Sequence, residues 1–287
     1  MPSRPGPFPL LPRKRQSDKS AFGHVLAVSG SRAMSGAPQL LARACLTAGA
    51  GLLTVGIPKS VRPAFAKKIL AEAMILELPE TSTGTPAAGA YQKILSFIRA
   101  RGVKVAAIGP GLSHDKNISS LVRKLVSAIP VPIVLDADGL NAFKGKKREL
   151  RKHRAPLVLT PHRGEFERLF EEKWPENKIV RTALAKKLSR FYDVTLVLKG
   201  YHTLVVDGDE VYENFTGNPG LAKAGSGDVL TGILAAFLAQ GLIPFKAACW
   251  ASYFHGRAGD LAAKAKSELA VLAGDIIEYL PKAFLLE

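Results

Sequence analysis

Short apolar runs alternate along the chain with longer segments in which apolar residues recur at helical spacing. The runs are continuous rather than alternating with polar residues, which is typical of buried parallel strands with helices on both faces. We predict strands at residues 24–29, 52–57, 73–78, 103–108, 132–135, 156–159 and 194–198. We predict helices at residues 37–48, 91–101 and 118–129, and a mainly helical C-terminal part beginning near residue 226.

One pair of predicted strands has a different character. Residues 203–206 and 210–214 flank Asp207-Gly208, a dipeptide that is typical of a tight β-hairpin turn. The pattern therefore predicts an α/β fold of three layers, α/β/α, with a mostly parallel central sheet and a β-hairpin. No repeat or linker divides the chain, so we predict an N-terminal arm at residues 1–21, flexible or draped over the surface, and a single domain at residues 22–287.

Charge and cysteine content narrow the classes of function. Forty basic against twenty-four acidic residues give a formal net charge of +16, which suits nucleic acid, a membrane surface or an anionic small molecule. The densest basic run, residues 144–154, lacks the aromatic residues of a base-stacking surface, so we expect no nucleic-acid partner. Cys45 and Cys249 are predicted to be small core residues in a reducing compartment. The chain has no predicted signal peptide or membrane span, and we expect a cytoplasmic protein without a membrane partner.

Several predicted strands run into polar or glycine-rich turns. These turns are Gly30-Ser31, Gly109-Pro110-Gly111, Asp136, Thr160-Pro161-His162 and Lys199-Gly200. Parallel strands end at the same edge of a sheet, and ligands of such folds bind beyond that edge. Any one turn is ordinary loop composition, but the set predicts a ligand site there.

The strongest single signal is the segment Gly225-Ser226-Gly227-Asp228, which precedes an apolar helical stretch. A glycine-rich turn entering a helix presents free N–H groups and the positive end of the helix dipole to an anion such as phosphate. The segment is neither a Walker A loop nor a GxGxxG dinucleotide fingerprint. Asp228 is either an acid favoured by the dipole or a general base beside the phosphate site. We expect the dipole to lower the pKa of Asp228. The carboxylate would then be a weak base that accepts a proton late in the reaction, once charge develops on the attacking oxygen.

The Gly225-to-Asp228 segment resembles the GxGD signature of the ribokinase-like superfamily. More narrowly, the chain resembles the ADP- or ATP-dependent NAD(P)HX dehydratases. The resemblance rests on residues 22–31, 35–55, 108–112, 132–141, 159–169, 198–200 and 218–241, in that order. It implies a ribokinase-like fold and a lyase that transfers a phosphoryl group from ADP or ATP to the hydroxyl of (6S)-NAD(P)HX. Elimination of phosphate then restores NAD(P)H, a repair of a damaged cofactor.

The resemblance also implies roles for individual positions. Asp228 would be the base, with Gly225, Ser226 and Gly227 as donors to the transferring phosphoryl group. The positions expected to bind the nucleotide are Lys199, Gly200, Tyr201, His202, Thr203 and Gly227. The positions expected to bind NAD(P)HX are Ala37, Gly111, His162 and Asp228.

Other expectations leave alternatives open. Glu165 follows His162 by three residues, as in an Asn-x-x-Glu motif of related vitamin kinases, so it is a candidate near Mg²⁺, although the pair is equally an ordinary helix cap. Asp136 and Asp138 would form a metal site or cap a short helix through Asn141, and Asp138 is alternatively a substrate-side or structural polar group. Lys223, just before the phosphate turn, has no assigned role.

ADP is favoured over ATP as the co-substrate, and relatives suggest a homo-oligomer, such as a tetramer. The alternative functions are a small-molecule kinase of the same fold, acting on a vitamin precursor, and a basic nucleic-acid-binding protein.

Overall fold

A single nine-stranded sheet organises the described part of the chain, which comprises residues 4–6, 8–10, 13–67 and 70–285 of the computed structural model. Its strand order is β3-β2-β1-β4-β5-β6-β7-β8-β9. The strands are β1 (His24–Val28), β2 (Leu52–Pro58), β3 (Met74–Leu78), β4 (Val105–Ile108), β5 (Ile133–Leu135), β6 (Leu157–Leu159), β7 (Thr195–Leu198), β8 (Leu204–Asp207) and β9 (Glu210–Glu213). Strands β3 to β7 pair in parallel, and β8 and β9 add the predicted antiparallel hairpin.

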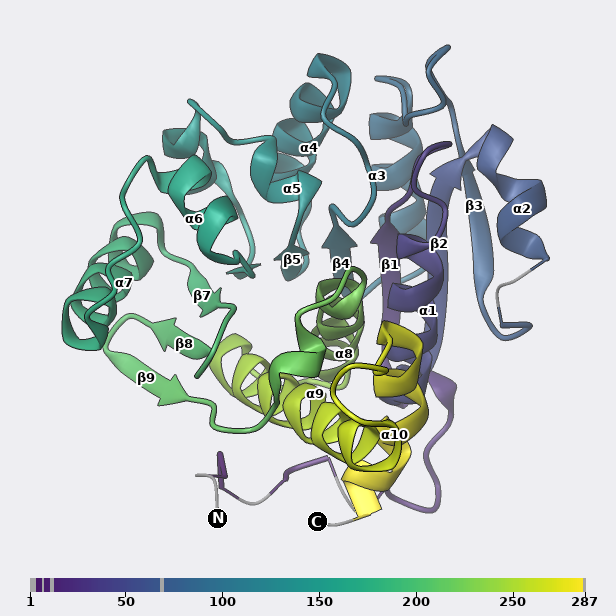
Figure 1. The fold of residues 1–287 in the computed structure, drawn as a ribbon. Helices are drawn as coiled ribbons and strands as arrows, with labels where there is room; N and C mark the ends of the chain where they lie inside the picture. Colours follow the sequence, from purple (N-terminus) through teal and green to yellow (C-terminus); the bar gives the residue numbers. More distant parts are fainter. Residues whose placement is uncertain (1–3, 7, 11–12, 68–69, 286–287) are drawn as a thin grey trace.

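Helices cover both faces of this sheet (Figure 1). They are α1 (Ala37–Thr47), α2 (Arg62–Ala66), α3 (Ala90–Ala100), α4 (Lys116–Ala128), α5 (Asp138–Asn141), α6 (Arg163–Phe170), α7 (Lys178–Tyr192), α8 (Ser226–Ala239), α9 (Pro244–Lys266) and α10 (Ala273–Leu285). The described residues also form four short 3₁₀ segments: η1 (Lys19–Phe22), η2 (Lys59–Val61), η3 (Lys147–Lys152) and η4 (Pro219–Leu221).

The strands β1, β4, β5, β6, β7 and β8 send alternate side chains into two separate cores. In β1, Val25 and Ala27 pack into the core shared with α1, α8, α9 and α10, whereas Leu26 and Val28 pack into the core beneath α3, α4, α6 and α7. Because both faces are buried, the strand sequences are continuously apolar. The predicted three-layer α/β/α architecture is confirmed.

The predicted strands agree with the observed ones to within one or two residues. Helices α6 and α7 were missed, because their sequences are rich in charged residues and carry only narrow apolar stripes. The two cysteines, Cys45 and Cys249, are unpaired and buried in the core, as predicted. No helix in the described part of the chain is long and apolar enough to span a bilayer.

Of the predicted arm, residues 1–3, 7 and 11–12 lie outside the described residues. The remainder packs against the body of the protein through Phe8 and Arg13. The Phe8 ring contacts four aromatic rings at centroid distances of 4.8–6.1 Å, those of Phe237, Trp250, Phe254 and Phe284. Arg13 donates to the carbonyl oxygen of Gly49 at 2.6 Å. These contacts fix the arm against α8, α9 and α10.

Candidate functional site

The polar turns predicted at strand ends lie together at the carboxyl edge of the sheet. Backbone hydrogen bonds continue from strand to strand past the last ladder positions. Gly30 N–H donates to Pro110, Asp136 N–H to Ile108, Thr160 N–H to Leu135 and Lys199 N–H to Pro161, at 2.9–3.2 Å. The ladder thus places Asp136, Thr160 and Lys199 in neighbouring turns.

Helix α8 begins at this edge, directly after Gly225. Gly225 has φ +90°, a conformation that favours glycine, and a Cβ there would lie 2.5 Å from Leu40 Cδ1. The Ser226 N–H donates to the Lys223 carbonyl oxygen at 3.3 Å. The amides that follow it in the first turn of α8 have no acceptor within the helix, so the N–H of Gly227 is available to an anion. On α9, His255 Nε2 donates to the carbonyl oxygen of Ser226 at 3.0 Å, which fixes the first residue of the helix. Burial lowers the pKa of His255 to about 4, so the ring is neutral near pH 7.

Asp228 is the third residue of α8 and is only partly exposed. The expectation that the helix dipole lowers its pKa is wrong. Burial, followed by the charge of Asp136, raises the pKa of Asp228 to about 7, and the nearby Lys199 offsets this only in part. Desolvation of the carboxylate therefore outweighs the dipole. A carboxylate with this pKa is suited to accept a proton near neutral pH.

Beneath the turn lies a buried ionic cluster of Asp136, Glu165 and Lys199. The Lys199 ammonium lies 2.6 Å from Asp136 Oδ1 and 3.5 Å from Glu165 Oε2, and only 17% of its side chain is exposed. Burial alone would lower the pKa of Lys199, but the two carboxylates raise it overall, so it stays charged. A Cβ on Gly227 would lie 3.3 Å from Lys199 Nζ, which places this cation directly under the turn.

His162 and Glu165 form a reciprocal capping box at the start of α6. His162 Nδ1 accepts from Gly164 N–H at 3.0 Å, and Glu165 Oε2 accepts from His162 N–H at 2.9 Å. The other oxygen, Oε1, lies 3.5 Å from His162 Nε2. Both Glu165 oxygens therefore face donors, and no three His, Cys, Asp or Glu residues in the described ranges cluster as metal ligands. Glu165 does not fit as a direct ligand of Mg²⁺ in this arrangement.

Asp136 and Asp138 bind different partners. Ala137 between them has φ +50°, so the alternation of the strand stops at this point. Asp138 Oδ2 accepts from Ser113 N–H at 2.7 Å, and Oδ1 lies 2.9 Å from His114 Nδ1. Asp138 thus fixes the loop after β4, whereas Asp136 faces α8.

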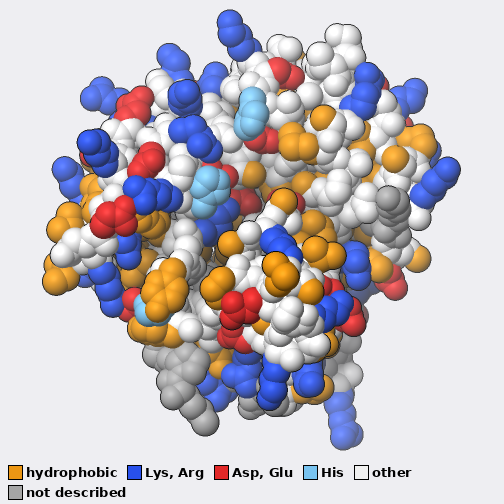
Figure 2. All heavy atoms as spheres, in the orientation of Figure 1, with side chains coloured by type: hydrophobic (Ala, Val, Ile, Leu, Met, Phe, Trp, Pro, Cys, Tyr) orange, Lys and Arg blue, Asp and Glu red, His pale blue; other side chains and the backbone are white. Residues whose placement is uncertain are grey.

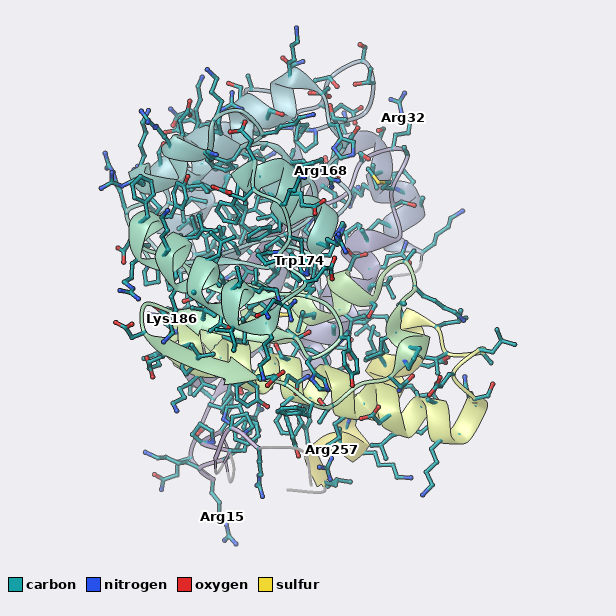
Figure 3. The ribbon with its side chains drawn as sticks, turned by 60° about the vertical axis from the view of Figure 1, so that its left-hand side comes forward. Arg15, Arg32, Arg168, Trp174, Lys186 and Arg257 are labelled. Carbon is teal, nitrogen blue, oxygen red and sulfur yellow. The ribbon has the colours of Figure 1, made fainter. Side chains whose placement is uncertain are left out.

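The residues expected on the substrate side lie in neighbouring loops. Gly111 has φ +70°, and a Cβ there would lie 3.0 Å from the Ala37 side chain. His162 is exposed at the start of α6 and is joined to the ionic cluster through Glu165. Arg168 of α6 adds a cation, since a Cβ on Gly164 would lie 3.2 Å from its Nη1. Arg32 and Arg168 both lie toward the top of the molecule in Figure 3, whereas Arg257 lies far below.

The segment expected to bind the nucleotide follows β7. Tyr201 is 91% exposed and stacks on the His202 ring at 3.9 Å. Thr203 Oγ1 donates to the Gly200 carbonyl oxygen at 3.0 Å and closes the turn. The edge of Phe215 meets His202 at 4.5 Å. The loop therefore presents an open aromatic surface beside the ionic cluster.

Besides Arg168, sequence reasoning missed Phe215, Thr231 and His255 at this edge. Thr231 is fully buried in α8 and donates to Asp136 Oδ2 at 2.9 Å. In the sequence, Thr231 and His255 could have been found as single polar residues within otherwise apolar helical segments. Lys223, for its part, donates from Nζ to the Leu269 carbonyl oxygen at 2.6 Å, so it ties the turn to the loop before α10.

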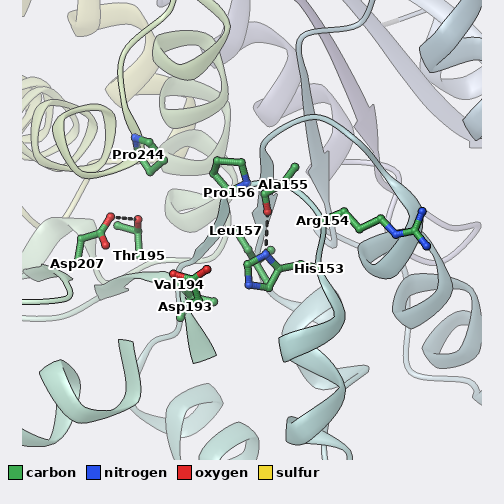
Figure 4. Close-up of a pocket in the computed structure, with 10 residues that line it drawn as sticks. All are labelled: His153, Arg154, Ala155, Pro156, Leu157, Asp193, Val194, Thr195, Asp207 and Pro244. Carbon is green, nitrogen blue, oxygen red and sulfur yellow. Dashed lines mark hydrogen bonds between the residues drawn. The ribbon is translucent and has the colours of Figure 1, made fainter. Parts of the chain in front are cut away.

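A hollow of about 400 Å³ lies at the opposite, amino edge of the sheet (Figure 4). It is lined by residues near the starts of β6 and β7, including His153, Asp193 and Thr195, and by Asp207. Thr195 Oγ1 donates to Asp207 Oδ2 at 2.6 Å, whereas Arg154 extends away from that pair. His153 Nδ1 lies 2.8 Å from the Ala155 carbonyl oxygen, so the His153 ring, like Thr195 and Asp207, is bound locally.

The positive charge does not gather in one patch on the face that Figure 2 shows. On the face shown in Figure 2, Lys and Arg side chains are spread widely, with Asp and Glu side chains among them. Ion pairs such as Lys147 with Glu171 and Arg190 with Asp209 account for part of this pattern.

Comparison with known proteins identifies the family. The family model described as NAD(P)H-hydrate dehydratase matches residues 25–282. The chain belongs to this family. A bifunctional NAD(P)H-hydrate repair enzyme, Nnr, of Moorella thermoacetica is 45% identical over 94% of this chain and 51% of its own length. An ADP-dependent (S)-NAD(P)H-hydrate dehydratase of Neisseria meningitidis is 36% identical over 94% and 88%.

Solved structures support the same conclusion. The ADP/ATP-dependent NAD(P)H-hydrate dehydratase of Bacillus subtilis, co-crystallized with ATP/Mg²⁺, superposes with a TM-score of 0.80 at 29% identity, covering 96% of this chain and 93% of that one. Hydroxyethylthiazole kinase of Pyrococcus horikoshii, at 17% identity and a TM-score of 0.62, shares the fold. The chain spans about half the length of the Nnr relatives that it matches.

Proposed function

We propose that the protein dehydrates (6S)-NAD(P)HX to NAD(P)H at the expense of ADP or ATP. Membership of the NAD(P)H-hydrate dehydratase family supports this proposal, as do the names of its relatives. The observation that carries it is local: Asp228, whose pKa is raised to about 7, follows directly on the turn Gly225–Gly227, and the Lys199 ammonium lies beneath Gly227. A proton acceptor and an anion site are thereby joined in one turn of helix.

The proposed reaction has two steps. The oxygen of the substrate hydroxyl attacks the terminal phosphorus of the nucleotide, and the bridging P–O bond of the nucleotide breaks. Asp228 takes the proton of that hydroxyl during the attack. The amides of Gly225, Ser226 and Gly227 donate to the oxygens that gain charge. Phosphate then leaves with that oxygen, and loss of a proton from the ring gives NAD(P)H. Nucleotide and hydrated cofactor together give NAD(P)H, phosphate and the shortened nucleotide. No free water is consumed, because the oxygen of the hydrate leaves within the phosphate.

The binding roles follow the neighbouring loops. We assign Lys199, Gly200, Tyr201, His202 and Thr203, with Gly227, to the nucleotide. We assign Ala37, Gly111 and His162 to NAD(P)HX, whose phosphates would meet cations such as Arg168.

We place Mg²⁺ on the nucleotide phosphates rather than on Glu165, because both oxygens of that carboxylate face donors. When bound, the ion neutralises charge on the transferring oxygens. The same proposal includes this position of the ion. It also includes a preference of the enzyme for ADP, a cytoplasmic location and a homo-oligomeric state.

The test is an assay of purified protein with NADHX and Mg²⁺, first with ADP and then with ATP, followed by NADH absorbance. We expect NADH to appear only when a nucleotide is present, and phosphate to be released in equal amount. Asp207→Asn, at the far edge of the sheet, is the matched control for Asp228→Asn. If wild-type protein forms no NADH with either nucleotide, the dehydratase proposal fails, and accumulation of a phosphorylated alcohol would instead support a small-molecule kinase.

A further inference from the structure

Asp136 is a buried carboxylate to which the proposed mechanism gives no part. It is 1% exposed and accepts three hydrogen bonds from three different elements. Its Oδ1 accepts from Lys199 Nζ after β7 at 2.6 Å and from Thr160 Oγ1 after β6 at 2.8 Å. Its Oδ2 accepts from Thr231 Oγ1 on α8 at 2.9 Å. A buried charge with this many donors is specifically compensated, and removing one partner leaves another unpaired.

The bond to Thr231 links this carboxylate to the reacting part of α8. Thr231 lies three residues beyond Asp228, so the two side chains share one face of the helix. A Cβ on Gly227 would lie 3.6 Å from Asp136 Oδ2, as well as near Lys199. The first turn of α8 therefore rests on the Asp136–Lys199 pair, and Thr231 fixes its rotation.

We propose that Asp136 is a positioning residue for the transfer step: through Thr231 it holds Asp228 in register over the anion turn, and through Lys199 it holds a cation beneath Gly227. The inference rests on the proposed function, in which Asp228 is the base. It assigns Asp136 no contact with substrate.

The charges around Asp228 give this role a measurable consequence. They come from every neighbouring element: Asp136 after β5, Asp138 in α5, Glu165 in α6 and Lys199 after β7, with His255 of α9 neutral beside Ser226. After burial, the charge of Asp136 is the largest influence that raises the pKa of Asp228. Neutralising Asp136 should therefore lower the pKa of Asp228, whereas a purely structural role of Asp136 would leave it in place.

The positional part is tested on Thr231. Thr231→Val keeps the branched shape in a fully buried place but removes the donor, and Thr231→Ser keeps the donor. We expect kcat of Thr231→Val to fall roughly ten- to a hundredfold, as for a misplaced catalytic group, with KM for ADP little changed. Thr231→Ser should recover most of the loss. A Thr231→Val enzyme with wild-type kcat would overturn the positioning role.

The electrostatic part is tested with Asp136→Asn, which preserves size and can still accept from Lys199. We expect the acidic limb of its kcat–pH profile to move to lower pH by about one unit. Asp207→Asn, an acid at the amino edge of the sheet, should leave that limb in place. An unmoved limb in Asp136→Asn would contradict the proposal.

A second readout does not depend on turnover. Carbon NMR of aspartate-labelled protein follows the titration of Asp228, whose signal is assigned by its absence in Asp228→Asn. A lower midpoint in Asp136→Asn supports the inference even if wild-type protein fails to act on NADHX, an outcome that would remove only the proposed function. An unchanged midpoint overturns the electrostatic role of Asp136 whether or not the enzyme is active.

Discussion

The two edges of the parallel sheet differ in how they treat charge. At the amino edge, Asp193 and Arg154 are exposed around a hollow of about 400 Å³. At the carboxyl edge, Asp136 and Glu165 are 1% and 5% exposed and share the Lys199 ammonium. Burying charged groups costs free energy even when they are paired. A buried ionic cluster therefore indicates a functional site more strongly than the volume of a hollow does. In this fold the buried, paired charges mark the functional edge of the sheet, and the hollow does not.

The largest expected effect is that of the Asp228→Asn substitution, which tests whether the carboxyl edge is the catalytic one. Loss of a general base typically costs two to four orders of magnitude, so we expect kcat to fall by roughly that factor while nucleotide binding persists. Single-turnover assays with calorimetric titration of ADP measure both quantities. Undiminished turnover in Asp228→Asn would show that the buried charges at this edge serve stability alone.

The pH dependence of the wild-type enzyme sharpens the contrast further. Asp228 must be deprotonated to accept a proton, and its pKa is raised to about 7. We therefore expect kcat to rise with pH and level off above about 7, falling roughly tenfold for each unit below the midpoint. A steady-state pH profile tests this, and a midpoint near the ordinary aspartate value would contradict the burial of this side chain.

Close packing of the anion turn gives a stability prediction. Gly225 and Gly241 flank α8, and both have positive φ, but only Gly225 is crowded, with Leu40 Cδ1 2.5 Å from the place of a Cβ. Alanine at Gly241 should cost about 1 kcal/mol of unfolding free energy from backbone strain. Alanine at Gly225 should cost roughly 2–4 kcal/mol, because overpacking adds to the strain. Urea denaturation of the matched pair measures the difference, and equal costs would mean that the turn is loosely packed.

We also expect the Asp228→Asn substitution to raise the stability of the folded protein above pH 7. Because the folded pKa is above the ordinary value of 3.8, folded protein binds more protons than unfolded protein between about pH 4 and 7. Wild-type protein therefore loses stability as pH rises through that window, and the asparagine variant does not. We expect Asp228→Asn to have a higher Tm than wild type at pH 8 and no advantage near pH 4, with roughly 2–4 °C for each kcal/mol gained. Equal Tm values at pH 8 would argue against burial of the charge.

The sequence predicted the strands and the glycine-rich turn better than the side-chain interactions between distant segments. Strand positions and the turn at Gly225 follow from local apolar runs and from one glycine-rich motif, both of which depend on nearby residues. The raised pKa of Asp228 depends first on burial and then on the charge of Asp136, which lies 92 positions away in the sequence and approaches it only in the folded protein. Thr231 and His255 were missed for the same reason, since a single polar residue in an apolar helix acquires a role only from what packs against it.

The smallest expected effect is at the amino edge, where Thr195→Val removes the hydroxyl that donates to Asp207. Thr195 is 3% exposed in β7, and valine preserves its branched shape within the strand. We expect a loss of about 1 kcal/mol in unfolding free energy, typical of one hydrogen bond, with kcat and its pH profile unchanged. Chemical denaturation and the NADH assay on the same preparation measure both. A fall in kcat without a fall in stability would mean that β7 couples the two edges, since the same strand ends at Lys199.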